Sequence, residues 1–485
     1  MMEPESDLAG PDAETGRDII VLLFCSLALY AATCLTGPGW GTEAALQTTC
    51  ITGASGSGDI FPAIFRIPAR LFVLAMPFGN PAAAVTIFCV LLSVATLLVV
   101  YLTIRLCNIP GRTALIALAA LALSQAWFSH STRPNVSAMA MLFLAVELHF
   151  LVRFLHLKTK RDVLIAACGS LLAFSVQPVS VAASLLPFAW LGLRLRFRSP
   201  KLFVPWILLI LAVSSSTSDF GFHASWILLL SIAFQFPFVN WLLLAWGMKH
   251  LSRRSPLILE ILLTMLLSAM PWNALSSHPL TFRDHLDALL PASLAATILI
   301  AYGLDHLYRL RALRKERVLF MTPVLAFSLA VLPIATTASI VYLAHASDME
   351  QRLVTASGPR ARLLSTPWQN ALWYALWPVK RYEGAAPCID DMEKFLPRDA
   401  VLIADPEIMP VVDYASRVEK RLPGIRALAL SEEDRLSDFD RLIRQSGGLP
   451  IFLAGVDPEY HAPEELGRRG ELIPAGLFLE WKRQR

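Results

Sequence analysis

The chain has 485 residues, of which 55% are hydrophobic and 16% are charged. A soluble domain of this size carries about 25% charged residues, so the composition excludes an ordinary soluble protein. The net charge of +4 says little about partners, because the arginines follow the topology, and we expect no nucleic-acid partner.

Apolar runs close to the length of a membrane span recur along most of the chain. A helix needs about 20 residues to cross a hydrocarbon core of about 30 Å, and continuous Leu/Ala-rich runs favour helices over a barrel. The pattern predicts an α-helical polytopic membrane protein with about eleven spans. We place them at 19–36, 82–104, 113–129, 136–156, 162–177, 180–194, 202–215, 225–247, 256–271, 287–307 and 318–344.

Lysine and arginine predict the orientation of these spans. They are concentrated in the alternate connections at 105–112, 153–161, 194–201, 249–254 and 309–317. The other connections hold only Arg66, Arg70, Arg133 and Arg283. Positive residues mark cytoplasmic loops, so we expect a cytoplasmic tail at 1–18, a membrane domain at 19–345, and everything beyond the last span outside. The acidic head lacks a basic region and a cleavage site, so we read 19–36 as a retained span.

The first outer loop, 37–81, is too long to be a simple connection. Its second half, "DIFPAIFRIPARLFVLAMPF", is apolar but contains Pro62 and Pro68. This pattern favours a helix lying on the membrane surface rather than a span. Arg66 and Arg70 are four residues apart and would share one face of that helix.

The segment 346–485 changes character, with frequent charges and shorter apolar runs. The stretches 400–405, 425–430, 450–455 and 476–481 resemble strands, and 407–421 and 431–445 resemble helices between them. This alternation predicts a small extracytoplasmic α/β domain with a mostly parallel sheet. No glycine-rich nucleotide motif accompanies it. Of the seven cysteines, only Cys50 and Cys388 fall in predicted extracytoplasmic segments, and a disulfide between them stays open because spacing does not give connectivity.

Three local patterns resemble one family. The loop "GPGWGTEAALQTTC" holds Gly41-Thr42-Glu43, the stretch "PFGNPAAAVTIFCVLLS" leads into the second span, and "LLPASLAATILIAYGLDHL" forms a late span. Together with the surface helix and the outer domain, they resemble the GT-C (C-fold) glycosyltransferases. Within these, the chain is similar to the bacterial multi-pass family related to transmembrane protein O-mannosyltransferases.

The resemblance implies a reaction in which a polyprenyl phosphate-linked sugar is transferred to an extracytoplasmic protein or glycan acceptor. The chain also departs from the family pattern. The acid before Gly-Glu is replaced by Trp40 or Gly41, the family's histidine is missing before "GDIFP", and Arg133-Pro134-Asn135 stands where a glutamate is expected. These losses put the catalytic role in doubt more than the fold.

Such a reaction needs a carboxylate to accept a proton or to hold a divalent metal, and cations to bind the donor phosphate. Glu43 is the candidate for the first role, although it could be a solvated loop residue or a charge at a helix start. Asp59 is a second candidate, and it could instead cap the surface helix. A divalent metal cofactor stays open.

Arg283, with His285 beside it in "FRDHLD", and Arg133 are candidates for the donor phosphate. Outer arginines also reach lipid headgroups without specificity, so both interpretations stay open. Within the membrane, we expect Glu147 to pair with His149 or with a hydroxyl of a neighbouring span. We expect Glu260 to pair with Arg253 or Arg254.

The sequence therefore favours a divergent glycosyltransferase-like protein of a bacterial inner membrane, in contact with membrane lipid. The alternative is a non-catalytic GT-C-fold scaffold or lipid-binding subunit. A coupled transporter is disfavoured because there is no inverted repeat and there are few charges within the spans.

Overall fold

A computed structural model of the chain describes residues 13–53, 62–76, 79–177, 187–191, 194, 238–267, 282–313, 384–404, 408–428, 441, 443–444, 448–454, 470–476 and 478–483. The predicted spans 202–215 and 318–344, the first half of 180–194 and the first half of 225–247 lie outside these residues. Asp59 and most of the predicted helix 431–445 lie outside them as well.

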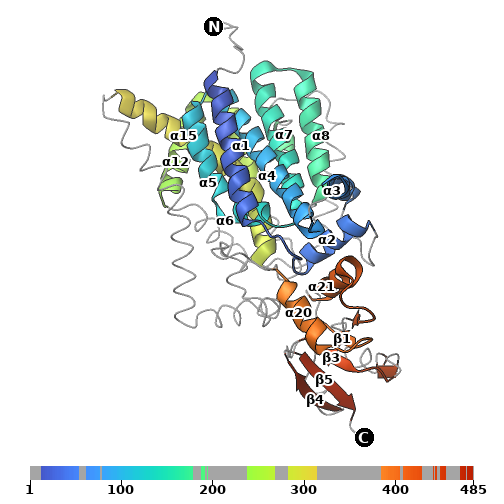
Figure 1. The fold of residues 1–485 in the computed structure, drawn as a ribbon. Helices are drawn as coiled ribbons and strands as arrows, with labels where there is room; N and C mark the ends of the chain where they lie inside the picture. Colours follow the sequence, from blue (N-terminus) through green and yellow to red (C-terminus); the bar gives the residue numbers. More distant parts are fainter. Residues whose placement is uncertain are drawn as a thin grey trace.

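A bundle of helices forms the larger part of the described chain (Figure 1). Four of its helices are long and apolar enough to cross a bilayer, at Thr15–Thr33, Pro81–Leu106, Ser137–Leu157 and Leu289–Leu310. They belong to α1 (Ala13–Thr33), α4 (Pro81–Leu106), α7 (Ser137–Leu157) and α15 (Phe282–Leu313). Shorter helices complete the bundle: α5 (Gly111–Ala122), α6 (Gln125–Ser131), α8 (Lys160–Val176), α12 (Phe238–Arg254) and α13 (Pro256–Leu267).

Local sequence explains where several of these helices begin. Asn80 caps α4 by accepting a hydrogen bond from the Ala82 N–H at 2.9 Å, and Pro81 occupies the first helical position, where no N–H is needed. The predicted span 113–129 is wrong in its continuity. Ser124 adopts an extended backbone between α5 and α6, and its hydroxyl donates to the Leu121 carbonyl.

Helix α3 (Ala63–Ala75) has the features predicted for a surface helix. Figure 1 shows it nearly end-on, whereas α4 and α7 run along the page, so α3 lies across the bundle. Phe65 is buried against the bundle, while Ile67, Leu71 and Leu74 are exposed. An apolar face left uncovered beside spanning helices is suited to the lipid boundary.

The carboxy-terminal segment (384–483) contains a five-stranded sheet with the order β2-β1-β3-β5-β4. Its strands are β1 (Val401–Ile403), β2 (Arg426–Leu428), β3 (Ile451–Leu453), β4 (Gly470–Ala475) and β5 (Phe478–Arg483). β1 pairs in parallel with β2 and β3, but β5 is antiparallel to both β3 and β4. The sheet is therefore mixed, and the hairpin strand β4 was not predicted.

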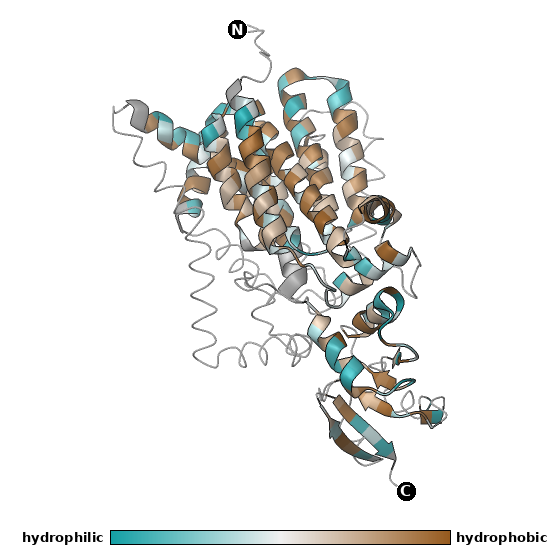
Figure 2. Ribbon diagram, viewed as in Figure 1, coloured by the Kyte–Doolittle hydropathy of each residue, from teal (hydrophilic) through white to brown (hydrophobic). Residues whose placement is uncertain are grey.

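Helices join this sheet to the bundle. α20 (Ala386–Phe395), α21 (Met409–Tyr414) and a π-helical turn, η4 (Ala415–Glu419), lie between the sheet and α2 (Thr42–Thr52). One hydrophobic core holds Trp40 and Ala44 together with residues of all three helical segments. The hydropathy colouring in Figure 2 shows the change from the apolar bundle to this more polar segment. The loop after α1 and the carboxy-terminal segment thus pack together at one end of the bundle.

Candidate functional site

The residues that follow α1 lie where several elements of the chain meet. The Leu35 N–H donates to the Thr132 carbonyl at 2.9 Å, which ties the loop to the one between α6 and α7. The Asn80 side-chain amide donates to the Thr36 carbonyl at 2.6 Å. The cap of α4 therefore also fixes the exit from α1.

The next residues, the Gly37–Gly41 loop, are held by α2 and by the carboxy-terminal segment. The Ala385 N–H donates to the Pro38 carbonyl at 2.9 Å. Gly384 beside it has φ 63°, and an added Cβ there would lie 2.1 Å from the same Pro38 oxygen. Because an L side chain is strained at this φ and meets backbone at this distance, the contact requires glycine.

Glu43 lies in the first turn of α2, at a helix start, which was one of the alternatives that the sequence left open. Gly41 precedes the helix with φ 48° and ψ −120°, a conformation that favours glycine. A carboxylate at this position is favoured by the helix dipole. The Glu43 side chain is 0% exposed, so it is not the solvated loop residue considered from the sequence.

Gly39 covers the Glu43 side chain. An added Cβ on Gly39 would lie 2.3 Å from Glu43 Cβ and 2.6 Å from Glu43 Oε2. Gln47, one helical turn after Glu43, is also 0% exposed and bonds to the Gly37–Gly41 loop through its amide. Sequence reasoning missed Gln47; its spacing of four from Glu43 places both residues on one helical face, but only once the helix is known.

Of the other predicted site residues, only Arg133 has a side chain that the structure describes. Arg133 follows α6 and is 9% exposed, in the loop that the Leu35–Thr132 bond joins to the Glu43 region. Arg283 and His285 lie in the first turn of α15, but their side chains fall outside the described part, as does all of Asp59. Glu43 and the Arg133 loop are therefore brought to one end of the bundle.

A small cavity lies between α4, α6, α7 and α15. Its volume is about 10 Å³, and its lining consists of Ser93, Trp127, His130, Ser131, Ala138, Met141 and Leu290. The volume is close to that of one water probe. His130 Nδ1 lies 2.6 Å from the Ala126 carbonyl oxygen. Because a carbonyl oxygen only accepts, Nδ1 donates this hydrogen bond and carries the proton.

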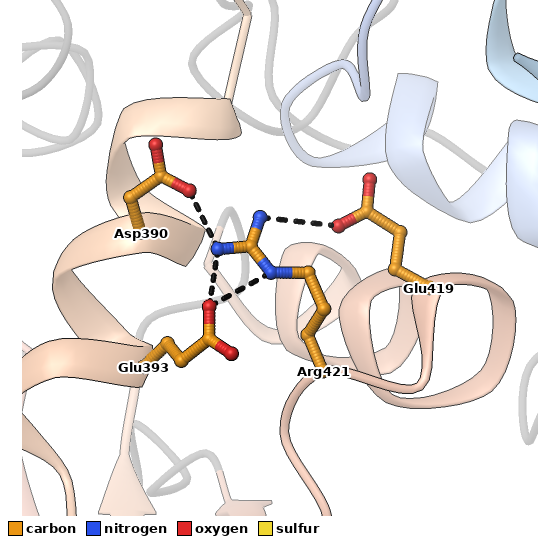
Figure 3. A network of polar contacts seen from close by, with 4 residues as sticks. All are labelled: Asp390, Glu393, Glu419 and Arg421. Atoms are coloured by element: carbon orange, nitrogen blue, oxygen red, sulfur yellow. Dashed lines mark hydrogen bonds and ion pairs between the residues drawn. The ribbon is translucent and has the colours of Figure 1, made fainter.

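A larger cavity of about 410 Å³ lies in the carboxy-terminal segment, beside Arg398, Lys420 and Arg421. Figure 3 shows that Arg421 is surrounded by carboxylates from two elements. It donates to Asp390 at 2.6 Å and to Glu393 at 2.9 Å, both on α20, and it forms an ion pair with Glu419 of η4. Arg421 thus joins α20 to η4, a role that serves the fold.

These partners shift the ionisation of the cluster. The hydrogen bonds that Arg421 donates to Glu393 and Asp390 raise the pKa of its guanidinium, so it stays charged. Burial raises the pKa of Glu419, and the neighbouring Arg421 opposes that rise without cancelling it. The basic residues of this cavity also follow the ends of α20 and η4, where positive charge is favoured by the helix dipoles.

The metal expectation finds no support from the described residues. Among them, no three His, Cys, Asp or Glu side chains gather in a way that could hold a metal ion. Cys50 and Cys388 are both buried thiols in the structure and form no disulfide bond.

Among the described residues, neither Glu147 nor Glu260 forms the contact that was predicted for it. His149 shares a hydrogen bond of 3.1 Å with Thr103 of α4 and not with Glu147. Glu147 is buried where α7 meets Gly169 of α8. Glu260 accepts hydrogen bonds from Arg194 at 3.0 and 3.2 Å rather than from Arg253 or Arg254.

Comparison with known proteins was informative at the level of structure. No protein-family model and no curated protein sequence matches the chain. The fold is similar to that of ArnT from Cupriavidus metallidurans in the apo state, with a TM-score of 0.54 and 12% identity over 97% of this chain and 98% of the other. ArnT bound to undecaprenyl phosphate aligns over the same shares, with a TM-score of 0.53 and 10% identity.

A second enzyme shares the arrangement. The oligosaccharyltransferase AglB from Archaeoglobus fulgidus, in complex with an inhibitory peptide and a dolichol-phosphate, aligns over 96% of this chain and 74% of its own, with a TM-score of 0.50 and 11% identity. The resemblance expected from the sequence is confirmed for the fold. The chain has the GT-C glycosyltransferase fold at 10–12% identity to these structures, and its long apolar helices support an integral membrane location.

Proposed function

We propose that the chain is a membrane glycosyltransferase that moves a sugar, mannose or a similar one, from a polyprenyl phosphate carrier to an acceptor outside the cytoplasm. The observation that carries the proposal is the GT-C fold over nearly the whole chain, with a buried glutamate in the first outer loop. Two proteins of this fold were solved with lipid phosphates, undecaprenyl phosphate in ArnT and dolichol-phosphate in AglB.

In the proposed reaction, Glu43 removes the proton from an acceptor hydroxyl as the acceptor oxygen attacks C1 of the sugar. The bond between C1 and the phosphate oxygen breaks, and the polyprenyl phosphate leaves with the electron pair. Arg283, and less directly Arg133, neutralise the charge that develops on this phosphate. His285 would add a hydrogen bond to the same group.

The proposal includes a topology. The chain crosses a bacterial inner membrane about eleven times, and the distribution of lysine and arginine places its amino terminus in the cytoplasm. The segment 346–485 forms an outer α/β domain that presents the acceptor. Packing of Trp40 and Ala44 against α20, α21 and η4 supports a shared compartment for the Glu43 loop and this domain.

One experiment tests the role of Glu43. The purified chain is given a radiolabelled polyprenyl phosphate sugar and a mixed acceptor fraction, and transfer by the parent is compared with Glu43→Gln. Loss of a general base costs about 10²- to 10⁴-fold in rate, so we expect transfer to fall by that factor. Glu471→Gln, which removes an exposed carboxylate from β4, is the control and should transfer at the parental rate. Equal transfer by Glu43→Gln and the parent would remove Glu43 from the mechanism.

A specific observation favours the second candidate, a non-catalytic GT-C scaffold. Glu43 is fully buried under Gly39, and several polar residues of the family pattern are absent from the outer loops. A scaffold would bind the lipid phosphate without transferring sugar. Donor binding without transfer by the parent would therefore support this alternative.

A further inference from the structure

We propose that Gln47 is a positioning residue for Glu43, acting through the Gly37–Gly41 loop. This inference rests on the proposed function for its effect on transfer. Its structural part can be tested without any transfer assay.

The side-chain amide of Gln47 binds three backbone groups, two in the Gly37–Gly41 loop and one at the start of α4. Its Oε1 accepts from the Gly39 N–H at 2.8 Å, and its Nε2 donates to the Gly37 carbonyl at 3.2 Å and to the Ala82 carbonyl at 3.3 Å. Gln47 is 0% exposed, so these bonds form away from water, where loss of one partner leaves the others unsatisfied. A buried amide with all three bonds made fixes the relative position of the loop, α2 and the start of α4.

The Gly39 bond links this arrangement to Glu43. Gly39 lies so close to Glu43 that a single added carbon would overlap the carboxylate oxygen. If the loop moves away, the cover over Glu43 is lost and water reaches the carboxylate. Gln47 therefore determines both the orientation of the Glu43 side chain and its exclusion of water.

The residue type at position 47 fits this role better than a charged residue would. The site must accept from one N–H and donate to two carbonyls at once, and only a neutral amide supplies both with one planar group. A carboxylate would repel Glu43 one turn away, and a hydrocarbon of the same size would remove this hydrogen-bond partner from the Gly39 N–H and from the Gly37 and Ala82 carbonyls.

Chemical labelling of Glu43 tests the structural part. The full-length protein in detergent is treated with a water-soluble carbodiimide and glycine ethyl ester, and modification at Glu43 is followed by peptide mass spectrometry. Each buried hydrogen bond contributes roughly fivefold to an opening equilibrium, so we expect Gln47→Met to label at least about tenfold faster than the parent.

Two further variants control this result. Thr48→Val removes a buried hydroxyl of the same helix that bonds only to Ala44 of α2 among the contacts described, and it should label at the parental rate. Gly39→Ala forces the loop and the carboxylate apart without touching the amide, and it should label faster, as Gln47→Met does. Gly39→Ala also tests whether displacing the loop exposes Glu43 if Gln47→Met does not fold. Parental labelling rates in both Gln47→Met and Gly39→Ala would overturn the proposal.

The transfer assay separates this inference from the proposed function. With Glu43 misplaced, we expect kcat of Gln47→Met to fall by roughly 10²-fold, while KM for the lipid donor stays near the parental value. Faster labelling with unchanged kcat would refute the positioning role. If Gln47→Met labels faster but neither the parent nor any variant transfers sugar, the proposed function is refuted. The role of Gln47 in positioning the Gly37–Gly41 loop over Glu43 would still hold.

Discussion

At the scale of single residues, Gly39 packs directly against the Glu43 side chain. Gly39 has no side chain where Glu43 needs space, and Gly41 provides the backbone angle that starts α2 immediately before the glutamate. The two glycines and Gln47 fix the backbone that surrounds this carboxylate. Its position in the chain could be predicted, but its environment could not.

The donor phosphate provides the first prediction at this scale. A charge-assisted hydrogen bond contributes about 1.5–3 kcal/mol, so Arg283→Gln should raise KM for the lipid donor about ten- to a hundredfold. Arg309→Gln is a matched control, because Arg309 lies toward the other end of α15 and pairs with Asp305. Steady-state kinetics with varied donor measure both. An unchanged KM in Arg283→Gln would show that the phosphate binds elsewhere.

Glu419 provides a second prediction, in its pH dependence. Burial raises the pKa of Glu419, so the folded state binds this proton more tightly than the unfolded state does. Its contribution to stability is present below the unfolded pKa and is lost as pH rises through the folded pKa. Glu419→Gln should therefore raise Tm relative to the parent at pH 7, and the gain should shrink as pH falls toward 4.

A contrasting variant checks the cause. Glu393→Gln weakens a hydrogen bond from Arg421 in the same cluster and should lower Tm slightly at pH 7, because the group is exposed. If Glu419→Gln and Glu393→Gln changed Tm in the same direction at pH 7, the burial of Glu419 would not be the dominant effect.

Sequence reasoning at this scale found charged residues but not their partners. Glu260 was assigned to Arg253 or Arg254, its neighbours in the chain, yet it binds Arg194 from another part of the sequence. Such pairings depend on which helices are adjacent, and residue spacing does not contain that information. Gln47 was missed for a related reason, since a neutral amide shows its role only when its backbone partners are known.

At the scale of elements, α12 and α15 pack through two glycines. An added Cβ on Gly247 would lie 1.9 Å from the Leu299 carbonyl oxygen, and one on Gly303 would lie 2.0 Å from the Leu243 carbonyl oxygen. Small residues let helices in a membrane approach closely. Backbone atoms cannot rotate away as a side chain can, so neither position has room for alanine.

Gly303→Ala should therefore destabilise the bundle by about 1–3 kcal/mol or more through overpacking, and Gly247→Ala should do the same. Gly16→Ala is the control, because nothing lies within 4 Å of a Cβ there and alanine favours the helix. Thermal unfolding in detergent compares the three. A Tm for Gly303→Ala equal to that of the control would contradict the close packing.

The lengths of the apolar runs predicted the long helices but not the breaks between helices. α4 and α7 cover the predicted spans 82–104 and 136–156 to within two residues. Ser124 lies within an apolar run, so the break between α5 and α6 gave no signal of its own. α2 was missed because its four threonines are weak helix formers, and its helical state depends on packing against α21 and η4. β4 contains Pro474, which an edge strand tolerates and a central strand does not.

At the scale of the whole molecule, the carboxy-terminal segment packs against the Gly37–Gly41 loop and against α2, which holds Glu43. They share a hydrophobic core and the hydrogen bond from Ala385 to Pro38. The basic turn between α7 and α8 lies at the opposite end of the bundle (Figure 1). The charge pattern predicts that these two ends face opposite sides of the membrane. The chemistry proposed for Glu43 requires in addition that its end faces away from the cytoplasm.

Sidedness is therefore the measurement that tests the account most directly. Single cysteines are introduced as Arg70→Cys on α3, Lys482→Cys on β5 and Lys158→Cys between α7 and α8, in a background where the exposed Cys25 and Cys168 are serine. All three positions are exposed. With a membrane-impermeant maleimide on intact spheroplasts, the first two should label, and the third should label only after permeabilisation. Labelling of Arg70→Cys and Lys482→Cys from opposite faces would contradict a common compartment for Glu43 and the carboxy-terminal segment.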